Sequence, residues 1–346
     1  KPGRPSQFAF HSPAELFDEY KGLTRGRDLD YSGLSHALID RLGPQQWPFN
    51  ASTEQGTERL YTDGQFATAN GRAQFIAEHL EDLKEATDSD YPLLLNTGRL
   101  RDQWHGMSRT GTAAQLFGHV ELAQLAMHPD DLAARGLQDG QLIRVSSRRG
   151  ELVLPVLAEP AQRPGQVFLP MHWGDRFLKG LGCNVLTQSG YDPLSKQPEL
   201  KQSSVQVSAA YLPWESFLLI EGDVQQHFAA LRRLGERFDY LGMGLIGRER
   251  PALVMRAAAA KAPSSELLAE LDNLCGLNSA TTMRYDDPAS GVSKRILLSD
   301  GRIIAMRLSG DTLARDWLRS LWQSADTDAS LQRWFLAPVS APPGAE

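Results

Sequence analysis

The chain has 346 residues, with 36 Lys and Arg against 42 Asp and Glu, so its formal net charge is −6. This length predicts two or three domains, and the hydrophobic content of 41% and charged content of 23% are typical of a soluble globular protein. The acidic balance argues against nucleic acid as the main partner. The sequence has no apolar run of about 18 residues and no basic region followed by an apolar run, which argues against a membrane span and a signal peptide.

The cysteine count restricts the metal chemistry that the chain can support. Cys183 and Cys275 are too few for a disulfide scaffold, a four-cysteine zinc site or an iron–sulfur cluster held by this chain alone. They indicate a reducing compartment, and we expect a cytoplasmic protein. A thiolate at Cys183 is chemically able to bind a metal ion, but a small buried hydrophobe is the favoured interpretation. Because the chain begins at Lys1 rather than Met, we expect a piece of a longer protein.

The first ninety residues carry few regular signals. One helix is predicted after Ser12, and a second short helix is predicted before Gly43. The Asp63-Gly64 pair predicts a hairpin over residues 60–68, and residues 75–77 indicate a further strand. No compact domain closes on this pattern, so we expect these elements to cover another surface.

Residues 91–210 predict a β-rich domain. A short helix is expected from Pro129 to Gly136, where a glycine permits the left-handed backbone that ends a helix. Short apolar or alternating segments predict strands at 92–96, 142–147, 152–157, 166–170 and 204–208. Short strands at this spacing favour a closed barrel.

The remainder of the chain, residues 214–346, predicts an α+β arrangement. The expected elements are a strand at 216–221, helices at 223–238, 264–277 and 312–322, and a hairpin at 295–308 around Asp300-Gly301. The segment 338–346 is rich in Pro and Ala and is expected to be a linker.

Two polar segments are candidates for a binding site. Asn96–Gly111 directly follows a buried strand and combines glycines with three arginines, a histidine and hydroxyl side chains. Such a loop suits phosphate oxygens or a polar heterocycle, although a solvated surface loop has a similar composition. The second segment contains Trp173, Asn184 and Lys201, which could stack on or hydrogen-bond a planar ring; a core tryptophan and a plain turn are the alternatives.

The order of these segments resembles a known domain. The loop Asn96–Gly111, the barrel strands, Asn184 and the ending Asp192–Lys201 resemble the molybdopterin-guanine-dinucleotide-binding domain of the molybdopterin oxidoreductases. Within that family the chain is similar to nitrate reductases of the periplasmic/assimilatory type, which share a Thr-Gly-Arg…Trp-His pattern and an Asp-Pro-x-Ser-x-x-Pro-Glu-x-Lys ending. Leu23–Asp28 and Gly43–Pro48 resemble the assimilatory catalytic subunit.

This resemblance implies an α+β fold with a central double-psi β-barrel, a flanking partial α/β segment and a small C-terminal α+β domain. The implied domains are a partial catalytic core at 1–90, the dinucleotide-binding barrel at 91–210, the α+β module at 214–337 and a linker at 338–346. Residues 280–322 also resemble, more weakly, a module at the end of NAD(P)H-dependent nitrite reductase and rubredoxin reductase flavoproteins, through Tyr285–Pro288, Leu297–Arg302 and Ser309–Asp311.

The cofactor implied by the resemblance is molybdopterin guanine dinucleotide, as Mo-bis-MGD. The implied cofactor-binding residues are Thr97, Gly98, Arg99, Trp104, His105, Gly106, Trp173, Asn184 and Lys201. No catalytic or metal-ligating residue is expected here, because the family carries its metal-ligating cysteine and its [4Fe-4S] cysteines in a larger portion outside this sequence. A [2Fe-2S] cluster is also expected outside these residues.

The expected function is that of the C-terminal part of a molybdenum-dependent nitrate reductase, which by itself would be inactive. Nitrate is the expected substrate, with electrons from ferredoxin, flavodoxin or an NADH-dependent reductase component. Two alternatives stay open: part of a formate dehydrogenase-like molybdoenzyme, because the barrel binds the shared cofactor rather than the substrate, and a non-catalytic cofactor-binding or assembly module.

Overall fold

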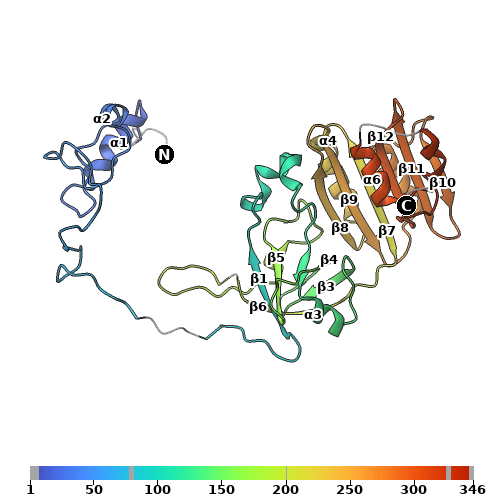
Figure 1. Ribbon diagram of the computed structural model, residues 1–346, viewed down its shortest axis with the longest axis horizontal. Helices are drawn as coiled ribbons and strands as arrows, with labels where there is room; N and C mark the ends of the chain where they lie inside the picture. Colours follow the sequence, from blue (N-terminus) through green and yellow to red (C-terminus); the bar gives the residue numbers. More distant parts are fainter. Residues whose placement is uncertain (1–7, 78–81, 200, 325–328, 343–346) are drawn as a thin grey trace, which may run out of the picture. The chain divides into compact units, whose positions relative to one another are not determined.

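The structure is a computed structural model that describes residues 8–77, 82–199, 201–324 and 329–342. These residues form two compact units that divide between residues 81 and 82 (Figure 1). Leu200 of the expected dinucleotide-binding segment and residues 343–346 of the expected linker lie outside the described residues.

The first unit contains two short helices, both of which were predicted. Helix α1 (Pro13–Gly22) is capped by Ser12, whose side chain accepts a hydrogen bond from the Glu15 N–H at 3.3 Å. Helix α2 (His36–Leu42) is capped in the same way by Ser35. It ends at Gly43, which has φ 76°, a backbone conformation that favours glycine.

Two other predictions for the first unit are wrong. Residues 60–68 form turns rather than a hairpin, and residues 75–77 are irregular rather than a strand. A strand needs a partner for its backbone groups, and the Phe75 and Ile76 side chains are 101% and 76% exposed. The Asp63-Gly64 signal therefore marks a local turn, which a hydrogen bond from the Gly64 N–H to the Tyr61 carbonyl closes at 3.0 Å.

The second unit begins with a closed six-stranded barrel, as the sequence predicted. Its strands are β1 (Leu93–Gly98), β2 (Leu125–Met127), β3 (Leu142–Ser146), β4 (Glu151–Ala158), β5 (Gln166–Pro170) and β6 (Ser203–Ala209). They close in the order β1-β5-β2-β4-β3-β6. The β1–β5 and β2–β4 pairs are parallel and the other pairs are antiparallel. Strand β2 was missed because all three of its residues are buried, so it has no alternating pattern.

One α-helix and several short 3-10 helices connect the barrel strands. Helix α3 (Pro129–Ala134) lies where it was predicted and is followed by Gly136 with φ 64°. The connection from β1 to β2 contains η1 (His105–Met107), η2 (Thr110–Thr112) and η3 (Ala114–Phe117). The connection from β5 to β6 contains η4 (Cys183–Val185). These two long connections carry the candidate site.

A six-stranded antiparallel sheet with helices follows the barrel. Its elements are β7 (Trp214–Glu221), α4 (Val224–Gly235), β8 (Tyr240–Ile246), β9 (Ala252–Ala259), α5 (Ser265–Leu274), β10 (Met283–Asp287), β11 (Val292–Ser299), β12 (Arg302–Ser309), α6 (Arg315–Gln323) and η5 (Ala329–Trp334). The strand order is β10-β11-β12-β7-β9-β8. Strand β7 alternates: Leu218 packs in the cluster that includes α4 and α5, and Leu219 packs in the cluster that includes α6.

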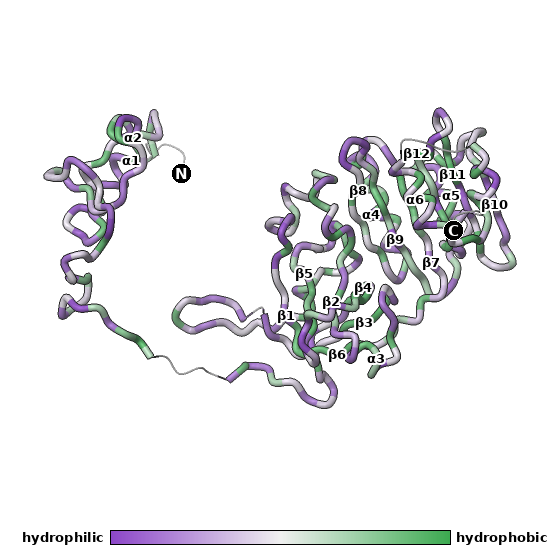
Figure 2. The backbone as a smooth tube through the Cα atoms, in the orientation of Figure 1, coloured by the Kyte–Doolittle hydropathy of each residue, from purple (hydrophilic) through white to green (hydrophobic). Residues whose placement is uncertain are grey.

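Strands β8 and β9 were not predicted from the sequence. Every residue of β8 is buried, and so is every residue of β9 except Arg256. Figure 2 shows both strands coloured hydrophobic along most of their length. A strand that is buried on both faces reads as a continuous apolar run, which periodicity alone cannot distinguish from other buried segments.

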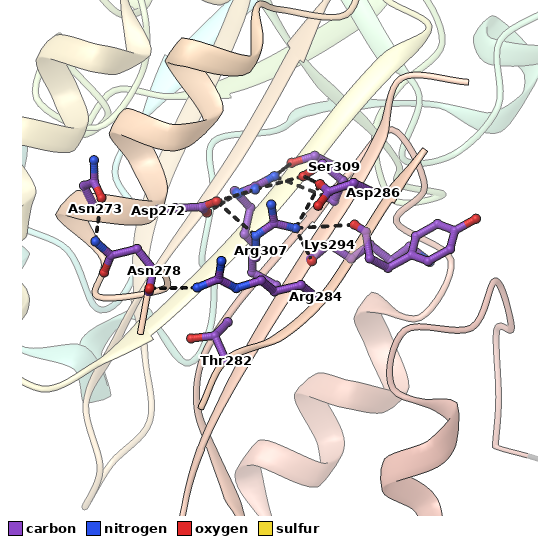
Figure 3. Close-up of polar contacts among 12 residues, drawn as sticks. Asp272, Asn273, Asn278, Thr282, Arg284, Asp286, Lys294, Arg307 and Ser309 are labelled. Carbon is purple, nitrogen blue, oxygen red and sulfur yellow. Dashed lines mark hydrogen bonds and ion pairs between the residues drawn. The ribbon is translucent and has the colours of Figure 1, made fainter. Parts of the chain in front are cut away.

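A charged network lies inside the C-terminal sheet (Figure 3). The Arg307 side chain is fully buried and donates two hydrogen bonds to the Asp272 carboxylate of α5, at 2.7 and 2.8 Å. It also donates to the Ser309 hydroxyl at 2.8 Å. A second cation, Arg295, lies 3.2 Å from the same carboxylate. Both charges of the Arg307–Asp272 pair are buried away from water. Each is therefore stabilised by the opposite charge of its partner rather than by solvent.

Removing Asp272 should therefore destabilise the sheet strongly. We expect Asp272→Ala to lower the free energy of unfolding by about 3–5 kcal/mol, because it leaves the buried Arg307 charge without its partner. Glu270→Ala is the matched control on the same helix, since it removes only the exposed ion pair with Arg237 and should cost at most about 1 kcal/mol. Urea unfolding of both variants measures the difference, and equal losses would contradict the prediction.

Candidate functional site

The parallel pairing of β1 with β5 determines where the two polar segments lie. Thr97 is in register with Leu169, and Gly98 with Pro170. Because the strands are parallel, their carboxyl ends lie side by side, and both connections leave the barrel at the same end. We call residues 99–124 the first loop and residues 171–199 the second loop. Two segments that are about seventy residues apart in the sequence are thus neighbours in the fold.

Close contacts tie the two loops together where they begin. The Met171 N–H donates to the Gly98 carbonyl at 2.9 Å, and the Leu100 N–H donates to Nε2 of His172 at 3.0 Å. A Cβ on Gly98 would lie 2.9 Å from the Phe168 ring, so a larger residue does not fit without a shift.

Lys201 reaches the same place from the far end of the β5–β6 connection. Its ammonium group donates to the Thr97 carbonyl at 3.2 Å. Three of the residues singled out from the sequence, namely Thr97, Gly98 and Lys201, are therefore brought together here.

The first loop contains a tight left-handed turn. His105, Gly106 and Met107 have φ values of 40°, 59° and 60° in succession. Met107 is fully buried and anchors the turn, whereas Trp104 and His105 are exposed and pack edge-to-face with ring centroids 4.8 Å apart. Non-glycine residues in this conformation carry strain, which persists only where the surroundings hold it. Successive backbone N–H groups in such turns can form a concave site for anions.

The arginines of the first loop differ in their partners. Arg101 forms a two-point ion pair with Asp102 at 2.8 and 2.9 Å, and this contact lowers the pKa of the Asp102 carboxyl. The Arg99 guanidinium lies over the Trp104 ring, 5.0 Å from its centroid. Among the described residues, neither Arg99 nor Arg109 has an ion-pair partner. These two arginines, unlike Arg101, keep their charge available for an anionic ligand.

The second loop places its predicted residues differently. The Trp173 side chain is 1% exposed and packs edge-on against Phe117, so it presents no ring face to solvent. Asn184 is exposed on η4. Just before η4, Gly182 approaches the Trp173 backbone so closely that a Cβ would lie 2.5 Å from the Trp173 carbonyl oxygen.

Several buried polar atoms in the two loops have no partner in the described part of the chain. They are Oε1 of Gln103, Nδ1 of His172, Nε1 of Trp173 and Nε2 of Gln188. Buried polar atoms in folded proteins are normally hydrogen-bonded, and an unpaired one costs roughly 1–3 kcal/mol. The residues present thus leave both donors and an acceptor for a polar ligand, which fits a phosphate-linked heterocyclic cofactor.

His172 is neutral in this environment. Its pKa is lowered by burial and, further, by the positive charges of Arg99 and His105. Since Nε2 accepts the Leu100 N–H, the single proton of the neutral ring lies on Nδ1. Sequence reasoning placed Gln103 inside the loop expected to hold the cofactor and His172 beside Trp173, but it named neither among the cofactor-binding residues. The position of His172 just after the end of a parallel strand was the available signal.

We expect His172 to titrate below the ordinary histidine pKa of about 6.5. Because the unfolded chain would bind this proton at a higher pH than the folded chain, the free energy of unfolding should fall as the pH drops below about 6.5. A histidine NMR titration measures the midpoint, and the non-titrating variant His172→Gln should lack this part of the pH dependence. A midpoint at or above 6.5 would contradict the assignment.

The edge strand of the C-terminal sheet holds both loops. Strand β8 pairs with the second loop through hydrogen bonds from the Lys179 N–H to the Leu241 carbonyl at 2.9 Å and from the Met243 N–H to the Phe177 carbonyl at 2.7 Å. A Cβ on Gly244 of β8 would lie only 2.3 Å from the Glu121 carbonyl of the first loop. The C-terminal sheet thus packs directly against the segments that form the site.

The two cysteines differ in position: Cys183 lies on η4 of the second loop, with its Sγ 3.7 Å from Oδ1 of Asn184, whereas Cys275 follows α5. Both are buried free thiols, and burial raises the pKa of Cys183 to about 11 and that of Cys275 to about 12. Cys183 therefore has the character of a small buried hydrophobe, as expected. Among the residues that the structure describes, no group of three His, Cys, Asp or Glu side chains could hold a metal ion. None of the helices in the same residues has the length and apolarity needed to span a bilayer.

Comparisons with known proteins match the part of the chain that contains both loops. Residues 93–204 match the family model described as the molydopterin dinucleotide binding domain. The chain is 40% identical over 218 residues to a nitrate reductase of Synechocystis sp., covering 60% of this chain and 29% of that protein. It is 31% identical over 208 residues to the assimilatory nitrate reductase catalytic subunit of Bacillus subtilis, covering 59% and 28%.

A formate dehydrogenase is also similar. The F420-dependent formate dehydrogenase subunit alpha of Methanocaldococcus jannaschii is 28% identical over 207 residues, covering 60% of this chain and 29% of that subunit. The chain spans less than a third of the length of each of these three relatives.

Proposed function

We propose that this chain, whose residues 93–204 match the molydopterin dinucleotide binding domain model, is the dinucleotide-binding part of a molybdenum-dependent nitrate reductase. The observation that carries the proposal is the pair of polar loops at the carboxyl ends of β1 and β5, inside the segment that matches this family. The similarity to nitrate reductases supports nitrate as the substrate.

The first loop suits the charged part of the cofactor. We assign Arg99 and Arg109 to the phosphate oxygens, because both lack an ion-pair partner among the described residues. The backbone N–H groups of the turn at His105–Met107 would complete the anion site. The exposed Trp104 ring, next to the Arg99 guanidinium, offers a surface for a planar ring of the cofactor.

The other predicted residues have supporting roles. Thr97 and Gly98 end the strand from which the loop emerges, and Lys201 is held beside them by the Thr97 carbonyl. Asn184 would contact the cofactor from the second loop, where its amide is exposed. Trp173 is buried, so we assign it a role in supporting the loop rather than in stacking on the cofactor.

The reaction is the reduction of nitrate to nitrite. Nitrate loses one oxygen atom as water and takes up two electrons and two protons. The bound molybdenum cofactor supplies the oxygen-atom transfer, and the residues described here bind and orient its dinucleotide. We propose that the electrons come from ferredoxin, flavodoxin or an NADH-dependent reductase component through iron–sulfur clusters whose ligands this chain, with its two buried cysteines, does not provide.

The finer assignments from the sequence are part of the same proposal. We propose a double-psi barrel, which the closed six-stranded order with two parallel pairs supports, and a cofactor in the bis-MGD form. Residues 1–90 would be the end of the catalytic core, 91–210 the barrel, 214–337 the C-terminal module and 338–346 a linker. The free thiols fit a cytoplasmic location.

A formate dehydrogenase-like enzyme is the second candidate, because a formate dehydrogenase subunit is among the similar proteins. The loops described here contact the shared cofactor, so they do not discriminate between the two substrates. The assay must therefore test both reactions.

The proposal predicts the cofactor content and the activity of the full-length protein. We expect purified full-length protein to contain molybdenum, iron and guanine dinucleotide, and to oxidise reduced viologen when nitrate is added. Formate-dependent reduction of oxidised viologen, without nitrate activity, would favour the second candidate. Absence of guanine dinucleotide from the full-length protein would overturn both and favour a non-catalytic module.

A substitution of Lys201 tests whether the dinucleotide binds next to this residue. We expect Lys201→Ala in the full-length protein to retain several-fold less guanine dinucleotide after gel filtration, because a charged contact is lost. Lys261→Ala is the matched control, since it removes an exposed lysine that belongs to neither loop and lies in the connection before α5. Retention equal to the control would count against the role of Lys201.

A further inference from the structure

We infer that His172 is itself a cofactor-binding residue, whose Nδ1–H donates a hydrogen bond to an acceptor oxygen or ring nitrogen of the bound dinucleotide. This inference rests on the proposed function and deepens it. It assigns a specific contact to a residue that was not among the cofactor-binding residues expected from the sequence.

The first argument is the location of the proton. The Leu100 N–H donates to Nε2 of His172 at 3.0 Å, so this nitrogen must carry a lone pair. A neutral imidazole has one proton, which is then on Nδ1. The ring is thus fixed in one tautomer by the backbone of the first loop. Its remaining nitrogen is a donor.

The second argument is that this donor has no acceptor in the described part of the chain. The His172 side chain has no exposed surface, and none of the described residues forms a hydrogen bond with its Nδ1 atom. Leaving a buried donor unpaired is costly, and folded proteins rarely do so without a functional reason. A partner supplied by a ligand removes this cost.

The third argument is the position of the ring. His172 lies two residues after the end of β5 and accepts a hydrogen bond from the Leu100 N–H of the first loop. The imidazole therefore lies against the backbone next to Arg99, whose charge adds to the effect of burial in lowering the pKa of His172. Trp173, the next residue, also has an unpaired buried N–H. The imidazole thus lies beside the loop that carries the arginine we assign to the phosphates.

A purely structural role does not account for both nitrogens. An anchor between the two loops needs only Nε2, which accepts the Leu100 N–H. Such an anchor would be equally effective with a side chain that has no group at the Nδ1 position. The two nitrogens can therefore be tested separately.

Two substitutions separate these roles. In His172→Gln the side-chain amide oxygen can take the position of Nε2 and accept the Leu100 N–H, but the Nδ1–H donor is lost. In His172→Asn the side-chain amide nitrogen can take the position of Nδ1 and donate, but the acceptor for Leu100 is lost. Both variants are made in the full-length protein. The measurement is the rate of release of guanine dinucleotide in sub-denaturing urea, together with the urea unfolding midpoint.

We expect His172→Gln to release the dinucleotide roughly fivefold to tenfold faster than the wild type, with little change in the unfolding midpoint, since one neutral hydrogen bond is lost. We expect His172→Asn to release it more slowly than His172→Gln, although its unfolding midpoint is lower. Release from His172→Gln at the wild-type rate, or faster release from His172→Asn than from His172→Gln, would overturn the inference.

A measurement on the wild-type protein covers the case in which a variant does not fold. With ¹⁵N-labelled histidine, the Nδ1 proton of His172 should exchange slowly in the loaded protein and much faster after the dinucleotide is removed. Equal exchange in both states would refute the contact. If the wild-type protein contains no guanine dinucleotide, the proposed function fails instead, so the two failures are distinguishable.

Discussion

The candidate site depends on the parallel pairing of β1 with β5. This pairing brings the ends of two strands, Gly98 and Pro170, to the same place, and the two polar loops begin there. An antiparallel pairing of the same strands would send the loops to opposite ends of the barrel. The hydrogen bond from the Leu100 N–H to the His172 side chain and the one from the Lys201 ammonium to the Thr97 carbonyl both follow from this register. Side chains on the loops contribute chemistry, but hydrogen bonds between the strands determine which of them meet.

The C-terminal sheet adds a second constraint. Strand β8 forms backbone hydrogen bonds with the second loop and packs against the first, so the loops are held between the barrel and the sheet. The sheet in turn is held together internally by apolar strands and by the buried pair of Arg307 and Asp272. The stability of the sheet and the geometry of the loops are therefore linked, and a change in the sheet can affect the site without touching it.

Much of this arrangement could be predicted from the sequence, and the exceptions have physical reasons. Capping serines, the glycine after α3 and the strand–turn signals of the barrel are local features, and they were interpreted correctly. Strands β8 and β9 were missed because burial on both faces removes the alternating pattern. The hairpin near Asp63-Gly64 was wrong because a turn signal does not supply a partner strand. The unpaired donor of His172 could not be found from the sequence, since it depends on which groups the fold leaves without a partner.

The pairing of β8 with the second loop also protects the protein against aggregation. An edge strand with free backbone groups can pair with another chain and start aggregation. The middle of the apolar edge strand β8, residues 241–243, is covered by residues 177–179, whereas the opposite edge, β10, is short and carries exposed charged side chains such as Arg284. Each edge thus has its own protection, and that of β8 is a segment of the candidate binding loop. A protein whose second loop detaches would lose more than a ligand contact: it would expose a continuous apolar strand to its neighbours.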